Sequence, residues 1–188
     1  MRGWRRSRGM LVTELDEQEA GVLRGLVGQV REMLAARAAE RPRDELAELT
    51  GIVTGPSTPP PDRTLARLLP DFHRVDGADG LDGEQPGADE AGALRSLHEP
   101  ALVAQKDGVA AVVLETLPPR GGTVRLTDEQ ARAWLYALND ARLALGTLLE
   151  VSEDMPDELP PDDPRAPHLG VYHWLTWVQE SLVQAVAG

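Results

Sequence analysis

The sequence contains no cysteine among its 188 residues. Disulfide bonds, thiolate metal sites, a cysteine nucleophile and a thiol-based redox switch are therefore excluded within this chain. Aromatic residues make up only 4% of the chain, and Lys106 is its single lysine. No apolar run reaches the roughly eighteen residues that a membrane-spanning helix needs. The basic start of the chain lacks the apolar segment of a secretory signal, which favours a cytoplasmic protein.

Acidic residues dominate the charge, because 31 Asp and Glu against 19 Lys and Arg give a formal net charge of −12. Such a surface repels phosphates and argues against broad nucleic-acid binding. Residues 1–9 differ, and we interpret them as a basic N-terminal arm before one domain over 10–188. The arm is either a solvated terminus or a contact for DNA or an acidic partner. Its candidate nucleic-acid residues are Arg2, Trp4, Arg5, Arg6 and Arg8.

Two segments share the pattern of a short strand that leads into a capped helix. Apolar and β-branched residues at 10–15 and 123–126 predict strands. Each strand is followed by a capping box, which begins at Asp16 or at Thr127. Apolar residues then recur at spacings of three and four, which predicts amphipathic helices. We predict a two-stranded antiparallel ribbon on a helical bundle, although capping boxes occur at many unrelated helix starts.

The remaining pattern predicts a mainly α fold with about four main helices. A helix is expected to start at Pro100 and run to Leu117, since proline is favoured at the first helical position. The last helix is expected near residues 171–186, where its apolar face either closes the core or pairs two subunits in a homodimer. Proline, glycine and acidic residues predict flexible loops at about 54–64, 74–89 and 150–168.

No motif for catalysis or nucleotide binding is present in the sequence. His168 and His173 lie near several acidic residues, but their spacing is not that of ligands on one helix face. We therefore predict no enzyme activity, no metal site and no cofactor, and keep a small metal-dependent enzyme as an alternative.

Polar residues interrupt the alanine- and leucine-rich segment around residues 135–146. They form either an internal network, for example between Arg142 and Glu180, or a surface that recognises a partner. Aromatic residues gather near the end of the chain, where they either anchor the core or mark an interface. The candidate partner or signature positions are Asn139, Asp140, Arg142, Trp174 and Trp177.

Several segments carry a resemblance to a known family. They are VTELDEQEAGVLRGLVGQV, LARLLPD, WLYALNDARLALGTLLEV and YHWLTWVQESLV, which cover about two thirds of the chain. Through them the sequence resembles the actinobacterial AosR-like oxidative-stress transcriptional regulators, a family long described as a domain of unknown function.

The resemblance implies regulation of transcription in the oxidative-stress response through a protein partner, such as a sigma factor or RNA polymerase. Direct DNA binding through the basic arm is the alternative. The chain departs from the usual chemistry of such regulators in one respect, because redox regulators commonly sense through thiols. A chain without cysteine has no group of that kind.

Overall fold

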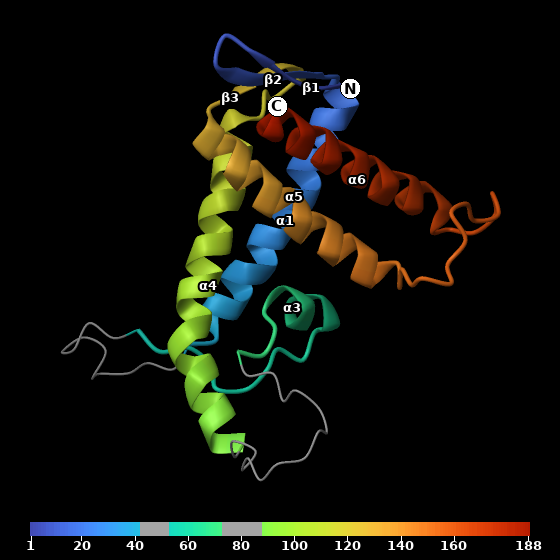
Figure 1. Cartoon of the computed structure of the whole chain (residues 1–188). Coiled ribbons are helices and arrows are strands. Elements are labelled where there is room, and N and C mark those ends of the chain that lie inside the picture. Colours follow the sequence, from blue (N-terminus) through green and yellow to red (C-terminus); the bar gives the residue numbers. More distant parts are fainter. Residues whose placement is uncertain (42–52, 73–87) are drawn as a thin grey trace, which may run out of the picture.

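The computed structural model describes residues 1–41, 53–72 and 88–188, which form a mainly helical fold with one small sheet (Figure 1). Its elements in chain order are β1 (Arg2–Ser7), β2 (Met10–Leu15), α1 (Glu17–Ala39), α3 (Arg63–Leu68), α4 (Ala88–Thr116), β3 (Gly122–Leu126), α5 (Asp128–Leu148) and α6 (Ala166–Ala187). The sheet lies at one end of the molecule, and α1 and α4 run side by side away from it while α5 crosses them. Most of the predicted loop at 74–89 lies outside the described residues.

The sheet has three antiparallel strands in the order β1-β2-β3. The predicted pairing of 10–15 with 123–126 is confirmed, since Leu11 pairs with Leu126 and Thr13 with Val124. The prediction of only two strands is wrong, because residues 2–7 form a third. The two-residue turn that connects β1 to β2 consists of Arg8 and Gly9, which both have positive φ. Turns of this kind follow the twist of a hairpin and favour glycine.

Both predicted capping boxes are confirmed in the structure. The Asp16 side chain accepts from the Glu19 backbone, and the Glu19 side chain accepts from the Asp16 backbone. Thr127 and Gln130 form the same pair of bonds at the start of α5. Each strand-helix unit thus begins its helix directly after a buried strand, which fixes how α1 and α5 leave the sheet.

The predicted start of a helix at Pro100 is wrong, because α4 begins at Ala88 and Pro100 lies in its interior. Proline in a helix interior lacks the N–H that would bond the carbonyl four residues earlier. Here the carbonyl of Ser96 instead accepts from the backbone N–H of Gly55 at 2.7 Å. The loop therefore supplies the donor that the proline removes, and α4 continues through Pro100.

The main core lies between the sheet and the helices α1, α4, α5 and α6. Trp134 is its largest fully buried side chain, and its Nε1 donates to the Thr116 hydroxyl at 2.8 Å. A second cluster joins α1, α3, α4 and α5 around Leu34 and Leu68. Burial of such side chains is the main source of folding free energy.

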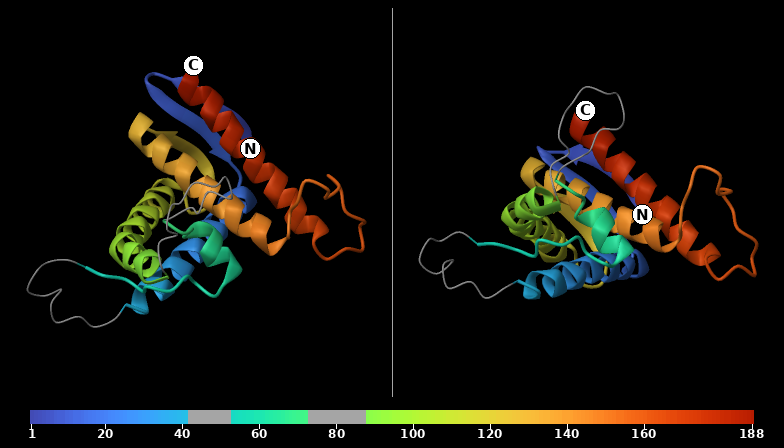
Figure 2. Two further views of the ribbon diagram at one scale, coloured as in Figure 1. Left: turned by 60° about the horizontal axis from the view of Figure 1, so that its bottom comes forward. Right: turned by 90° about the horizontal axis from the view of Figure 1, so that it is seen from below.

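The last helix begins at Ala166, five residues before its predicted start at residue 171. Leu175, Val178 and Leu182 of α6 belong to the main core, so its apolar face packs within the chain. A rotated view shows α6 beside β1 (Figure 2). Within the described residues, none of the helices is long and apolar enough to cross a membrane.

Candidate functional site

The residues predicted to form a basic arm lie in the hairpin of β1 and β2. The Trp4 side chain is only 7% exposed and packs edge-to-face on Trp134, with 5.4 Å between ring centroids. Its backbone N–H donates to the Ser181 hydroxyl of α6 at 2.8 Å. The interpretation of Trp4 as a nucleic-acid contact is therefore wrong, because the ring belongs to the core.

Arginines of this hairpin lie on both faces of the sheet. Arg5, Val12 and Arg125 lie opposite one another on β1, β2 and β3. Residues paired in this way point to the same face. Val12 is buried between two exposed arginines, whose aliphatic stems can cover it. The register thus places two cations on the solvent side of the sheet.

The other predicted arginines have different surroundings. Arg6 lies opposite Leu11 and forms an ion pair with Asp128 at 2.9 Å. Arg2 is exposed, and its side chain is 3.5 Å from Glu14. Arg8 occupies the turn of the hairpin with a φ of 52°. Of the predicted set, Arg2 and Arg6 are thus ion-paired, whereas Arg5 and Arg8 are exposed and have no ion-pair partner among the described residues.

The three polar candidates on α5 do not form one network. Asp140 is buried and accepts from the Lys106 ammonium at 2.6 Å. Burial raises the pKa of Asp140, while the bond from Lys106 acts in the opposite direction. Asn139 is half-buried, and Arg142 lines a cleft beside α3. The structure thus separates the three positions by environment.

The suggested bond between Arg142 and Glu180 is absent from the part of the chain that the structure describes. Instead, Lys106 is the partner that reaches the stripe on α5, from the neighbouring helix α4. A signal for this pair was present, because the single lysine of the chain stands between apolar positions of a helix. Such a residue is commonly paired when it is buried.

The two candidate tryptophans of α6 differ in exposure. Trp177 is 43% exposed and lies against Gly3 of β1, where an added Cβ would be 3.9 Å from its ring. Trp174 is half-buried and lines a shallow groove with Glu19 and Val22 of α1. Trp177 is thus the aromatic side chain of this pair that another protein can reach.

The predicted linker position of His168 is wrong, because His168 and His173 both lie in α6. Both side chains are exposed. Among residues 1–41, 53–72 and 88–188, no three His, Asp or Glu side chains are grouped closely enough to hold a metal ion.

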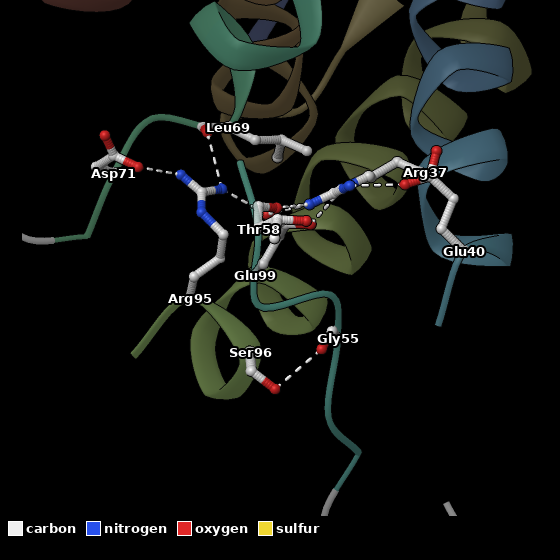
Figure 3. Close-up of polar contacts among 9 residues, drawn as sticks. All are labelled: Arg37, Glu40, Gly55, Thr58, Leu69, Asp71, Arg95, Ser96 and Glu99. Atoms are coloured by element: carbon white, nitrogen blue, oxygen red, sulfur yellow. Dashed lines mark hydrogen bonds and ion pairs between the residues drawn. The ribbon is translucent and has the colours of Figure 1, made fainter. Parts of the chain in front are cut away.

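The most buried group of charges is a network that the sequence analysis did not find (Figure 3). Arg37 of α1 donates to Glu99 of α4 at 2.7 Å, and Arg95 donates to the other oxygen of Glu99 at 2.5 Å. All three side chains are at most 4% exposed. Arg95 also bonds Asp71 and the Leu69 carbonyl after α3.

This network connects α1, α4 and the segment after α3 at the end of the molecule that lies away from the sheet. Arg37 also reaches the Thr58 carbonyl, which ties down the loop before α3. Burial lowers the pKa of Arg37, but hydrogen bonds to Glu99 and Glu40 outweigh it and hold the pKa above the usual value for arginine. The network is a structural clamp between α1, α4 and the α3 region.

Comparison with protein families gives a match to the domain of unknown function DUF2017 over residues 1–186. The chain belongs to the DUF2017 family. Proteins named oxidative stress regulator AosR, from Mycobacterium bovis and Mycobacterium tuberculosis, are each 44% identical to it over 178 residues. The aligned region covers 94% of this chain and 82% of each relative. No solved structure matches the chain significantly.

The predicted family resemblance is thus confirmed for this DUF2017 protein. Its relatives carry the name of regulators and not of enzymes. The name does not say whether such a regulator contacts DNA or another protein.

Proposed function

We propose that this protein regulates transcription in the oxidative-stress response by binding a protein partner, a sigma factor or RNA polymerase, and that it catalyses no reaction. The observation that carries the proposal is the 44% identity with regulators over nearly the whole chain. The net charge of −12 also favours a protein partner, because it opposes binding to nucleic acid in general.

The surface that best suits a partner lies where α6 meets β1. We call it the Trp177 surface, and it consists of the exposed ring of Trp177 and the neighbouring Gly3 of β1. Tryptophan is among the residues most enriched at the energetic centres of protein interfaces. Arg5 is exposed two residues further along β1 and adds a positive charge to that strand, which suits a partner segment that carries carboxylates.

The test is binding of the purified full chain to purified RNA polymerase, with and without a sigma factor, measured by biolayer interferometry. We expect Trp177→Ala to weaken binding at least tenfold, since hot-spot truncations cost about 2 kcal/mol or more. Tyr136→Ala is the matched control, because Tyr136 is also an exposed aromatic side chain on a helix, at 60%. Absence of binding to either form of the polymerase would contradict the proposal.

Direct DNA binding is the second candidate, and the arrangement of Arg5 and Arg125 favours it. Both arginines lie on the solvent side of a β sheet, and β ribbons can enter a DNA groove. A mobility-shift assay at low salt tests this candidate, with Arg5→Gln/Arg125→Gln as the variant. A shift that the double variant abolishes supports DNA binding, whereas no shift at low salt removes it.

A further inference from the structure

A cleft lies at the end of α5, bounded by α3, the chain after α5 and α6. Its volume is about 470 Å³, within the range of pockets that bind small molecules. Its polar lining consists of Arg63, Arg67, Arg142, Thr147, Glu150, Ser152 and Tyr172. This cleft is separate from the Trp177 surface and from the buried network of Figure 3.

Three arginines gather at the cleft in a chain that is strongly acidic overall. Arg63 and Arg67 lie one turn apart on α3, which places them on one face of that helix. Arg142 faces them from α5. Glu150 pairs with Arg63 at 3.0 Å. Among the described residues, no carboxylate lies within ion-pair distance of Arg67 or Arg142, so the lining carries an excess of positive charge.

The wall of the cleft is held in place by backbone contacts. The helix α5 ends where the N–H of Val151 bonds the Gly146 carbonyl at 2.9 Å. This ending places Glu150 at a φ of 55°, which is uncommon for a residue other than glycine. A Cβ on Gly146 would lie 3.0 Å from the Tyr172 ring. Glycine at this position therefore lets Tyr172 of α6 pack against α5.

We propose that this cleft binds an organic small molecule that carries a phosphate group. Three arginines and one glutamate leave a net charge of about +2, which balances a phosphate dianion. The guanidinium fork donates two hydrogen bonds to neighbouring oxygens of one phosphate. The remaining space, beside the Tyr172 ring, accommodates an organic group that inorganic phosphate lacks.

The Glu150 carboxylate competes with the phosphate for Arg63. An incoming phosphate must displace or share that ion pair, which spans two exposed side chains. Removal of the Glu150 charge should therefore strengthen binding, while removal of an arginine should weaken it. Opposite effects from two neighbouring side chains distinguish a binding role from a structural one.

Isothermal titration calorimetry at low ionic strength tests the proposal with adenosine monophosphate, inorganic phosphate and citrate as probes. We expect adenosine monophosphate to bind more tightly than either of the other two. Equal affinity for inorganic phosphate, a preference for citrate, or no binding of adenosine monophosphate overturns the proposal.

The variants test which residues form the site. Arg142→Gln should weaken adenosine monophosphate binding at least tenfold, and Glu150→Gln should strengthen it about threefold or more. Arg132→Gln is the matched control, because Arg132 is exposed on the same helix outside the cleft. If Arg142→Gln fails to fold, Arg142→Lys keeps the charge, loses the fork and should still weaken binding. Equal effects of the Arg142 and Arg132 variants overturn the assignment.

Discussion

The backbone N–H of Gly55 donates to the carbonyl oxygen of Ser96 at 2.7 Å. The Ser96 hydroxyl donates back to the Gly55 carbonyl at 2.9 Å, as Figure 3 shows. In a regular helix the Ser96 carbonyl would accept from residue 100, which is proline here. A loop residue thus replaces a missing bond inside α4. A buried carbonyl left without a donor would destabilise the fold.

Gly55→Ala should destabilise the protein by about 1 to 3 kcal/mol, the usual range for an overpacked site. An added Cβ would lie 3.0 Å from Cγ of Pro100. Urea unfolding of Gly55→Ala, Pro100→Ala and the double variant measures the coupling. Because Pro100→Ala removes the obstructing atoms, the alanine at 55 should cost less in the double variant. Additive effects of the two substitutions would contradict this explanation.

Glu99→Gln should lower the free energy of unfolding by about 3 to 5 kcal/mol, as expected when one member of a buried ion pair is removed. Arg37 and Arg95 would both lose their shared buried carboxylate. Chemical denaturation measures the loss. Asp71→Asn is the control, since Asp71 is 71% exposed and should cost less than about 1 kcal/mol. Similar costs for the two variants would show that burial of the network is unimportant.

Asp107→Asn should destabilise the protein slightly at neutral pH and leave its stability unchanged in strong acid. Arg31 holds the pKa of Asp107 below its ordinary value of 3.8, mainly by a hydrogen bond. A lowered native pKa stabilises the fold above the ordinary value, and that contribution is lost as pH falls through the native pKa. Both side chains are over one third exposed, so the effect should stay below about 1 kcal/mol.

The measurement is the difference in unfolding free energy between the wild type and Asp107→Asn from pH 2 to pH 7. The difference should be greatest near neutral pH. A difference that grows toward low pH would have the wrong sign.

Asp140→Asn should change the pH dependence of the unfolding free energy in the sense opposite to Asp107→Asn. Burial raises the pKa of Asp140 even though Lys106 opposes the shift. A raised native pKa means that the group favours folding below the ordinary value of 3.8, and that this contribution declines as pH rises through the native pKa. The neutral amide does not titrate, so the decline should be missing from the unfolding free energy of the variant. Parallel pH profiles for both proteins would contradict the assignment.

Regular local patterns allowed much of the fold to be predicted. The capping residues Asp16 and Thr127 mark the starts of α1 and α5, and apolar and β-branched residues mark β2 and β3. Strand β1 was missed because its composition is dominated by arginine, which resembles a solvated terminus. The signal in the sequence was Gly9, because glycine readily adopts the positive φ that a tight hairpin turn needs.

The features that were not predicted from the sequence depend on contacts between distant segments of the chain. Pro100 stays within α4 because a donor comes from Gly55, and no pattern local to the helix reveals it. Likewise, the role of Glu99 as a buried ion-pair partner becomes visible only when the packing of α1 on α4 places Arg37 beside it. Of the candidate site residues, Arg142 and Trp177 do face solvent-accessible surfaces, whereas Trp4 is part of the core.

The central position of β2 has a consequence for the order in which the molecule assembles. Its neighbour β1 precedes it directly, but its other neighbour, β3, follows α4 in the chain. During synthesis on the ribosome, the hairpin can form early, yet one side of β2 stays open until residue 126 has emerged. The apolar side chains of β2 therefore stay exposed on the nascent chain through most of translation. This is the stage at which a chaperone would bind the chain.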